Sequence, residues 1–235
     1  MSVTTKNPAR SPAGPMGASL HRHGVLFIIS APSGTGKTTL CKQLVASIPG
    51  LWHSISCTTR KPRAGEEHGR EYFFIEEATF QEMIDRHEFV EWARVYGHLY
   101  GTPRKSLTDK LDQGIDVLLE IDVQGALQVK KKFDDSVSIF ILPPSMAALR
   151  TRLQTRASDA PEEIQRRLQK VKEEVWNYRQ YTYVVRNDEL GRSLRELETI
   201  FLAERSKTAR MDTAWIERDF LLADESQSEN RTDHH

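Results

Sequence analysis

The segment Ser30-Ala31-Pro32-Ser33-Gly34-Thr35-Gly36-Lys37-Thr38-Thr39 combines small residues, a lysine and hydroxyl groups at a spacing that suits a phosphate chain. Its small residues let consecutive backbone N–H groups turn toward one point, and the N-terminus of the helix that follows adds partial positive charge. Lys37 would reach the β- and γ-phosphates of a nucleotide, and the Thr38 hydroxyl would be a ligand of Mg²⁺. The first glycine of the general pattern is Ala31 here, a difference of one methyl group. We interpret the segment as a phosphate-binding P-loop rather than a glycine-rich turn with a surface lysine.

A second candidate for anion binding is the segment 58–66, Thr-Thr-Arg-Lys-Pro-Arg-Ala-Gly-Glu. Arg60 and Arg63 flank a proline turn, from which two guanidinium groups can hold one small dianion. Tyr72 and Tyr100 could donate phenolic hydrogen bonds to the same phosphate. Two arginines in a loop are by themselves most often a solvated surface. The position of this loop after a P-loop favours the binding interpretation.

The residues on either side of the P-loop predict a strand before it and a helix after it. Residues 25–29, Val-Leu-Phe-Ile-Ile, are typical of a strand that is buried on both faces. Apolar residues then recur at helical spacing over 39–48, and Pro49-Gly50 ends the helix. Strand, glycine loop and helix are the elements that a P-loop requires.

The rest of the chain alternates strands and helices. Strands are expected at 117–121, 137–142 and 183–185, and helices at 125–132, 145–155, 161–178 and 194–204. This order predicts an α/β fold with a parallel sheet. Residues 57–101 differ, because charged loops and hairpin-like alternation predict a mostly β insert, with one helix opened by a Thr79–Glu82 capping box.

Composition bounds the possible partners. Lysine plus arginine equals aspartate plus glutamate at 33 each, so the whole-chain charge would attract neither nucleic acid nor membrane. No apolar run reaches the length that spans a membrane, and the two cysteines lack metal-ligand spacing, which favours a reducing cytoplasm. Residues 1–22 are proline-rich and polar and are expected to be a disordered tail, with a transit peptide as the alternative. Residues 206–235 are expected to form a C-terminal helical and polar tail.

With these motifs in order, the chain resembles the guanylate kinases, members of the nucleoside monophosphate kinase group of P-loop enzymes. The resemblance runs from about residue 24 to 201 and also rests on Glu-Phe-Val-Glu-Trp-Ala from Glu88, Tyr-Gly-Thr-Pro from Tyr100, Leu-Glu-Ile-Asp-Val-Gln-Gly from Leu119 and Leu-Pro-Pro-Ser from Leu142. It implies a three-layer P-loop NTPase core with a parallel sheet, an inserted mostly β GMP-binding subdomain and a helical lid. The implied domain covers 23–205, with the core at 23–56, 103–144 and 171–205, the insert at 57–102 and the lid at 145–170.

The resemblance also implies roles for individual residues. The donor ATP would contact Ala31, Pro32, Ser33, Gly34, Thr35, Gly36, Lys37, Thr38, Thr39 and Asn187. GMP would contact Ser56, Arg60, Arg63, Tyr72, Glu91, Tyr100, Thr102 and Asp122, with Thr102 standing where the family often has serine. Catalysis would fall to Lys37, Arg60 and three lid arginines, Arg152, Arg156 and Arg167, together with Mg²⁺ on Thr38.

Two of these residues also make chemical sense as readers of guanine. Guanine presents N1–H and N2–H₂ donors, and the carboxylates of Glu91 and Asp122 are pure acceptors. By itself Glu91 could equally be an exposed charge on a hairpin, whereas Asp122 follows an apolar strand, where ligand sites of α/β proteins occur. The resemblance favours the functional interpretation of both.

We therefore expect an ATP:GMP phosphotransferase that acts on GMP, and on dGMP as well, with Mg²⁺ and small-molecule nucleotides as its partners. Two alternatives come from other classes: a non-catalytic guanylate-kinase-like module that binds phosphorylated protein through Arg60 and Arg63, and a kinase for another phosphorylated sugar or nucleotide. An intact Lys37-Thr38 pair speaks against the first, and two acidic base readers speak against the second. The pattern indicates no particular number of subunits.

Overall fold

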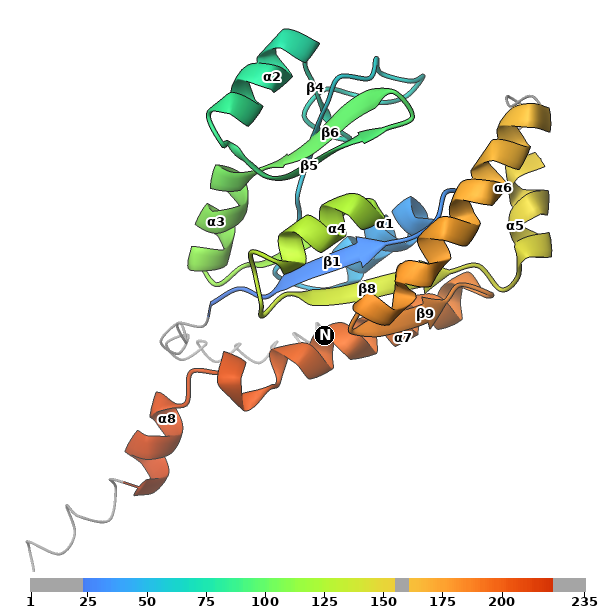
Figure 1. Cartoon of the computed structure of the whole chain (residues 1–235). Coiled ribbons are helices and arrows are strands. Elements are labelled where there is room, and N and C mark those ends of the chain that lie inside the picture. The colour runs from blue at the N-terminus through green and yellow to red at the C-terminus, as the bar shows by residue number, and fades with distance from the viewer. Residues whose placement is uncertain (1–22, 155–160, 222–235) are drawn as a thin grey trace, which may run out of the picture. The chain divides into compact units, whose positions relative to one another are not determined.

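The computed structural model describes residues 23–154 and 161–221. It divides into two units, of which the larger ends at Thr213 and holds both sheets (Figure 1). The smaller unit includes the helical turn α8 (Ala214–Ile216) and the π-helical turn η3 (Glu217–Leu221). The tail expected at 1–22 lies outside the described residues, which include residues 206–221 of the tail expected at 206–235. None of the described helices is both long and apolar enough to cross a membrane.

The core sheet has five parallel strands in the order β2-β7-β1-β8-β9. Their bounds are β1 Leu26–Ser30, β2 Leu51–His53, β7 Asp116–Glu120, β8 Val137–Leu142 and β9 Tyr183–Arg186. β1 is the central strand, and all five of its side chains are buried, as expected for an apolar strand covered on both faces. Because the pairing is parallel, the P-loop after β1 and the acidic residues after β7 emerge at the same edge of the sheet.

Helices cover both faces of this sheet, which makes three layers (Figure 1). The bounds are α1 Lys37–Ser47, α3 Arg104–Asp112, α4 Val123–Lys130 and α7 Leu190–Arg205. On one face, α1 and α7 pack on alternate residues of β1, and Phe27 stacks on Phe201. On the other face, α3 and α4 pack on Leu26 and Ile28. The predicted three-layer α/β fold with a parallel sheet is confirmed.

A second sheet is built entirely from residues between β2 and α3. Its strands are β3 Cys57–Thr58, β4 Phe73–Phe74, β5 Phe89–Val95 and β6 His98–Pro103, in the order β4-β3-β6-β5. The helix α2 (Glu77–Asp85) buries Phe80 beneath it, where Phe80 stacks on Phe89. This small separate core gives the insert its own apolar interior.

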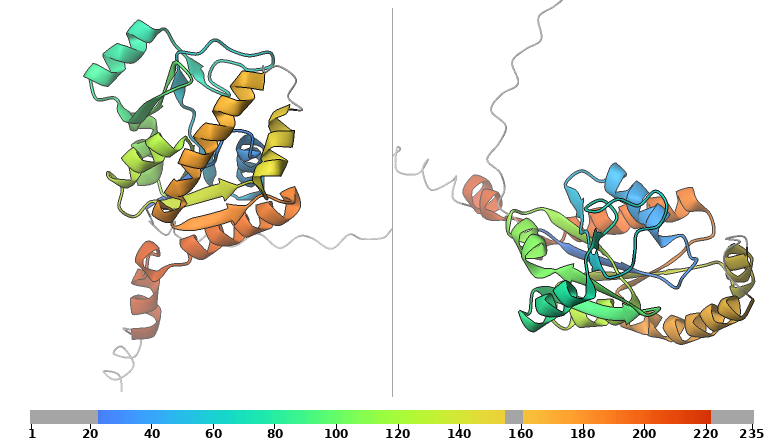
Figure 2. Two further views of the ribbon diagram at one scale, coloured as in Figure 1. Left: turned by 45° about the vertical axis from the view of Figure 1, so that its right-hand side comes forward. Right: turned by 90° about the horizontal axis from the view of Figure 1, so that it is seen from above.

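Two helices, α5 (Met146–Gln154) and α6 (Pro161–Val175), follow β8 and lie side by side (Figure 2). Leu149 and Leu153 of α5 pack on Leu168 and Val171 of α6, in a small apolar cluster of their own. A 3₁₀ turn, η1 (Trp176–Gln180), then leads to β9.

Several local boundaries differ from the sequence expectations. The capping-box prediction is wrong, because α2 begins at Glu77 and Thr79 is already inside the helix. The helix expected at 125–132 begins earlier, at Val123, because the Asp122 side chain caps it by accepting a hydrogen bond from Gly125 N. The helix expected to reach residue 178 ends at Val175 and continues as η1.

A buried carboxylate at the start of β7 links three elements of the core. Asp116 is fully buried, and its Oδ1 accepts a hydrogen bond from Val25 N at 2.8 Å. Its Oδ2 accepts from Arg205 Nε, at the end of α7, at 2.5 Å. Loss of one partner of such a buried ion pair lowers the free energy of unfolding, because the other charge stays buried without compensation.

We expect Asp116→Ala to lower the free energy of unfolding by about 3–5 kcal/mol. Asp116→Asn should cost less, because its amide oxygen can still accept from Val25 N. Denaturant unfolding of both variants measures the difference, with Asp112→Ala on the exposed end of α3 as the control. Equal stability of Asp116→Ala and the parent protein would contradict this account of the core.

Candidate active site

The P-loop adopts a conformation that requires its glycines. Gly34 and Gly36 have φ values of 87° and 93°, in the left-handed region that side chains disfavour. A β-carbon at position 34 would also lie 2.9 Å from a methyl group of Leu153 on α5. The carbonyl of Thr35 accepts hydrogen bonds from Asn187 Nδ2 at 2.7 Å and from Arg152 Nη1 at 3.1 Å. The conformation of the P-loop is thus stabilised by Arg152 of α5 and by Asn187 after β9.

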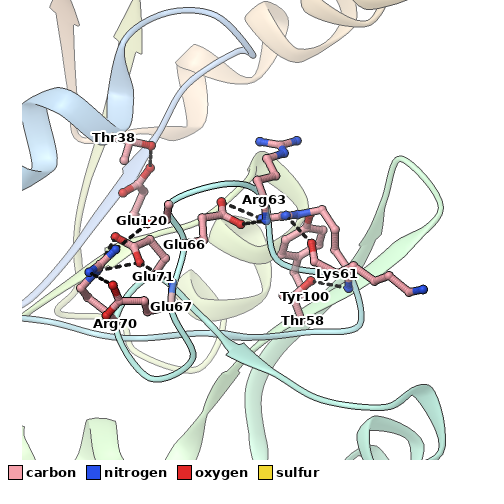
Figure 3. Close-up of polar contacts among 12 residues, drawn as sticks. Thr38, Thr58, Lys61, Arg63, Glu66, Glu67, Arg70, Glu71, Tyr100 and Glu120 are labelled. Atoms are coloured by element: carbon pink, nitrogen blue, oxygen red, sulfur yellow. Dashed lines mark hydrogen bonds and ion pairs between the residues drawn. The ribbon is translucent and has the colours of Figure 1, made fainter. Parts of the chain in front are cut away.

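Lys37 and Thr38 begin α1 and face the end of β7. Lys37 Nζ donates to the carbonyl of Ile121 at 3.1 Å and lies 3.9 Å from Glu120 Oε1. Thr38 Oγ1 donates to the same Glu120 oxygen at 2.5 Å (Figure 3). A hydroxyl and a carboxylate side by side are the hard oxygen ligands that Mg²⁺ prefers. Among the described residues there is no cluster of three or more His, Cys, Asp or Glu side chains that could hold a metal ion.

Glu120 is a site residue that the sequence analysis missed. It lines two of the cavities described below and also lies 3.6 Å from His53 Nε2. Its position in the sequence could have indicated a site residue, since Glu120 ends an apolar parallel strand immediately before Ile121 and Asp122.

Three neighbouring cavities surround the P-loop. The Asn187 cavity, of about 470 Å³, is lined by Gly34, Gly36, Thr39, Arg152, Asn187, Asp188 and Leu190. The P-loop cavity, of about 250 Å³, is lined by residues 31–39, Tyr72, Val95, Tyr96, Glu120, Asp122 and Glu174. The insert cavity, of about 210 Å³, is lined by Lys37, Ser56, Tyr72, Glu91, Ala93, Val95, Tyr96, Tyr100, Glu120, Ile121 and Asp122. Lys37 lines both the P-loop cavity and the insert cavity, so these two spaces meet at its side chain.

The arginine loop of the insert gathers around one carboxylate. Arg60 donates through Nη2 to Glu66 Oε1 at 2.9 Å and through Nε to the Tyr100 hydroxyl at 3.2 Å. The other oxygen of Glu66 accepts from the backbone N–H of Arg63 at 2.8 Å. Burial alone would raise the pKa of Glu66, but these hydrogen bonds outweigh it and hold that pKa below its ordinary value. Sequence reasoning had assigned Glu66 no role.

The structure therefore places Arg60, Tyr72 and Tyr100 together, with the Arg60 guanidinium 5.6 Å from the centre of the Tyr72 ring. Burial raises the pKa of Tyr72 to about 12, so its hydroxyl remains a hydrogen-bond donor at neutral pH. Arg63 differs, because its side chain is exposed and extends away from Glu66 (Figure 3). Among the contacts described, only the backbone N–H of Arg63 takes part in the hydrogen-bond network around Glu66.

The two candidate readers of guanine lie in the same cavity. Glu91 of β5 is 3% exposed, and its Oε1 accepts a hydrogen bond from Thr102 Oγ1 at 2.6 Å. Thr102 in turn lies 3.4 Å from the hydroxyl of Ser56. Asp122 reaches the cavity from the other side, after β7. Glu91 is therefore a buried group rather than the exposed hairpin charge that the sequence left as an alternative.

Burial raises the pKa of Glu91 to about 7. The hydrogen bond from Thr102 favours the charged form, while the nearby Asp122 charge disfavours it. Near neutral pH, Glu91 is therefore protonated in a fraction of the free protein molecules. A ligand that donates hydrogen bonds to this carboxylate must displace that proton.

We expect GMP to bind more tightly as the pH rises toward about 7, the folded pKa of Glu91, and to level off above it. Below that pKa the free site carries a proton that the complex releases, because hydrogen bonds donated by the base favour the charged carboxylate. Titration calorimetry in buffers of different ionisation enthalpy measures that release. Glu91→Gln is the control, because it keeps the titration of the GMP phosphate and removes that of the carboxyl. Equal proton release in both proteins would contradict the assignment.

The lid residues are placed only in part. Arg152 donates to the backbone carbonyls of Thr35 and Asn187, at 3.1 Å and 3.3 Å, and so braces the P-loop and lines the Asn187 cavity. Arg156 and the Arg167 side chain lie outside the described residues. On α6, Lys170 lies 4.5 Å from the centre of the Tyr96 ring at the tip of the β5–β6 hairpin, which links the lid to the insert.

Comparison with known proteins agrees with this architecture. The family model described as guanylate kinase matches residues 23–204. The guanylate kinase of Geobacter metallireducens is 48% identical over 199 residues, covering 85% of this chain and 98% of its own. That of Geobacter sulfurreducens is 47% identical over 192 residues, covering 82% and 95%. The crystal structure of guanylate kinase from Anaplasma phagocytophilum is 31% identical and superposes with a TM-score of 0.70, over 92% of this chain and all of that one.

The family model matches nearly the whole of the larger unit, and these relatives are covered almost completely. Together with a P-loop next to a cavity that Glu91 and Asp122 line, these matches show that this chain belongs to the guanylate kinase family.

Proposed function

We propose that the protein is an ATP-dependent guanylate kinase, which transfers the γ-phosphoryl group of ATP to GMP and forms ADP and GDP. The observation that carries the proposal is the insert cavity, in which Glu91 and Asp122 face a space bounded by Lys37 of the P-loop. Guanine offers N1–H and N2–H₂ donors where adenine offers no matching set, so two carboxylate acceptors select guanine.

GMP would bind in the insert cavity with its base against Ser56, Glu91, Thr102 and Asp122. Its phosphate would lie at Arg60, Arg63, Tyr72 and Tyr100, of which Arg60 and Tyr100 are already in contact. Glu66 fixes the plane of the Arg60 guanidinium and keeps one edge of it occupied. The same set would hold dGMP, because none of these contacts depends on a ribose hydroxyl.

ATP would bind along the P-loop, with its phosphates on the backbone N–H groups of residues 31–39 and its base in the Asn187 cavity. Asn187 and Arg152 both hold the carbonyl of Thr35, so this part of the loop is shaped before the nucleotide arrives. Thr38 and Glu120 present adjacent oxygen atoms and would hold the Mg²⁺ that arrives with ATP. When bound, that ion would neutralise charge on the β- and γ-phosphates.

In the transfer itself, an oxygen of the GMP phosphate attacks the γ-phosphorus, and the bond from that phosphorus to the β–γ bridging oxygen breaks. Catalysis consists of alignment and of charge neutralisation, since phosphoryl transfer needs no side-chain nucleophile. Lys37 lies where the two nucleotide sites meet and supplies a fixed positive charge there. Arg152, Arg156 and Arg167 of the lid would add positive charge on closure.

The alternative of a non-catalytic module is not favoured by the P-loop, whose glycine conformations and Lys37 placement serve a nucleotide phosphate chain. A kinase for another small phosphorylated substrate has no use for Glu91 and Asp122 in one cavity. A cytoplasmic location fits both the substrates and two buried free cysteines, Cys41 and Cys57.

The direct test is a coupled assay of ADP formation with ATP, Mg²⁺ and each of GMP, dGMP, AMP, UMP and CMP. We expect turnover with GMP and dGMP, and discrimination against AMP by about 10⁴-fold or more, as for sites whose buried polar groups are left unpaired by the wrong substrate. Comparable turnover with AMP or with a pyrimidine nucleotide would overturn the assignment, and so would binding of GMP without ADP formation.

A further inference from the structure

One side of the α4 segment contacts the strand that carries Glu91. Gly125 and Gln128 in α4 and Lys132 in the turn after it take part in these contacts. Gly125 and Gln128 are three residues apart, a spacing that places them on one helix face. α4 belongs to the core, whereas β5 belongs to the second sheet, so these contacts join the two.

Gln128 binds the outer edge of β5. Its Oε1 accepts a hydrogen bond from Trp92 N at 3.2 Å, and its Nε2 donates to the Trp92 carbonyl at 2.7 Å. β5 is an edge strand of the four-stranded sheet, and its outer backbone groups face no other strand. The amide of Gln128 therefore pairs with this edge as a residue of a neighbouring strand would.

Lys132 makes the matching contact on the other side of Glu91, where its ammonium group donates to the carbonyl of Val90. Val90 and Trp92 are the residues immediately before and after Glu91. The backbone on both sides of the carboxylate is thus fixed to the α4 segment. The β5–β6 register shifts at this same point, between Phe89 and Glu91.

Gly125 completes the arrangement, because it touches both carboxylates. Its backbone N–H donates to Asp122 Oδ1 at 2.9 Å. A β-carbon on residue 125 would lie 2.3 Å from Glu91 Oε2, closer than any non-bonded contact allows. The Glu91 carboxylate therefore occupies the space that a side chain at position 125 would fill.

We propose that Gly125, Gln128 and Lys132 are positioning residues that set the separation of Glu91 and Asp122, and through it the selectivity for guanine. This inference rests on the proposed function, since it takes these two carboxylates to be the base readers. The physical reason is that Asp122 is fixed to α4 as its N-cap, while Glu91 lies on an insert strand with a separate apolar core. Without a direct link, the distance between the two acceptors would follow any movement of the insert. A displacement of about 1 Å at a reacting or recognition group can cost about 10²-fold in rate.

The experiment compares GMP with IMP, whose base lacks the 2-amino group but keeps N1–H. The variants are Gln128→Met, which keeps the length of the side chain without its hydrogen bonds, Lys132→Met and Gly125→Ala. Gln113→Met, at the exposed end of α3, is the matched control. Kinetic constants for GMP, IMP and ATP are measured together with thermal unfolding.

We expect Gln128→Met to raise the KM for GMP about tenfold, the loss of two hydrogen bonds of ordinary strength. IMP should be affected less, so the ratio of kcat/KM for GMP over IMP should fall, while the KM for ATP stays within about twofold. Lys132→Met should act in the same direction. Gly125→Ala is the most discriminating variant, because alanine is a better helix former than glycine and yet its β-carbon displaces Glu91. It should reduce the GMP-over-IMP ratio with little change in the unfolding midpoint.

A merely structural role gives a different result: lower unfolding midpoints with an unchanged GMP-over-IMP ratio in Gln128→Met and Gly125→Ala. That outcome would overturn the inference and leave the proposed function standing. If the parent protein itself showed no preference for GMP over IMP and AMP, the proposed function would fail first. Should Gln128→Met not fold, an unchanged ratio in Gly125→Ala overturns the inference by itself.

Discussion

Replacement of Lys37 by alanine is expected to lower turnover about 10²- to 10³-fold at saturating ATP, the usual cost of removing one preorganised group that stabilises transition-state charge. Lys37 Nζ contacts the Ile121 carbonyl and lies near Glu120, and Lys37 and Glu120 both line the P-loop cavity and the insert cavity. It is only partly buried, so its removal leaves the apolar layers around β1 intact. Steady-state kinetics and thermal unfolding are measured on the same preparation.

The matched control for this prediction is Lys42→Ala. Lys42 lies on the same helix, α1, is largely exposed and pairs with Glu71 rather than with the P-loop. We expect it to retain parent turnover within about twofold, as surface ion pairs contribute little. Near-parent turnover in Lys37→Ala would contradict the assignment of the P-loop to the catalytic centre. An equal loss in both variants would indicate an effect on helix α1 rather than on the phosphates.

Glu91→Gln is expected to lower kcat/KM for GMP by about 10²-fold, because hydrogen bonds to a charged acceptor contribute about 1.5–3 kcal/mol. The amide keeps one acceptor oxygen but turns an NH₂ group toward a guanine donor, so one acceptor is replaced by an opposing donor. Thr102 Oγ1 loses a charged partner as well. The KM for ATP should change little, since the P-loop and the Asn187 cavity make no contact with Glu91 among the described residues. GMP and AMP turnover and ATP affinity are measured together.

Glu88→Gln is the control for that experiment, since Glu88 is an exposed carboxylate three residues before Glu91 in the same segment. It should leave GMP use unchanged. Undiminished selectivity for GMP over AMP in Glu91→Gln would remove Glu91 from the base site. A fall in selectivity in both variants would point to a disturbed strand β5 instead of a lost acceptor.

The sequence was sufficient for features whose causes are local. The P-loop, the strand before it and the helix after it follow from composition and spacing within about twenty residues, and the described structure has all three. The parallel order followed from alternating apolar runs. The predicted start of α4 was two residues too late. The helix begins at Val123 because the Asp122 side chain caps it, whereas the sequence analysis gave Asp122 a role only in reading the base.

Other features depend on contacts between distant residues, which periodicity does not encode. Glu120 meets Thr38 across 82 positions, and Arg152 meets Thr35 across 117. The contact of Arg152 with the P-loop therefore depends on where β8 and α5 lie in the fold, which the local sequence does not encode. Glu66 was overlooked for a different reason, because a carboxylate next to arginines usually indicates a solvated loop. Glu66 is half-buried against Arg60, whose guanidinium also binds Tyr100 of β6.

The insert also has a consequence for the order in which the molecule assembles. Its hairpin joins β5 to β6 through a tight turn, so these strands can pair soon after they are synthesised. β1 must instead wait for β7, because the hydrogen bond from Val25 to Asp116 closes a loop of 91 residues. The central strand of the core, although made early, thus stays without its partners until the whole insert has left the ribosome. An insert that folds early fills about half of this loop with compact structure and shortens the search that β1 and β7 must make.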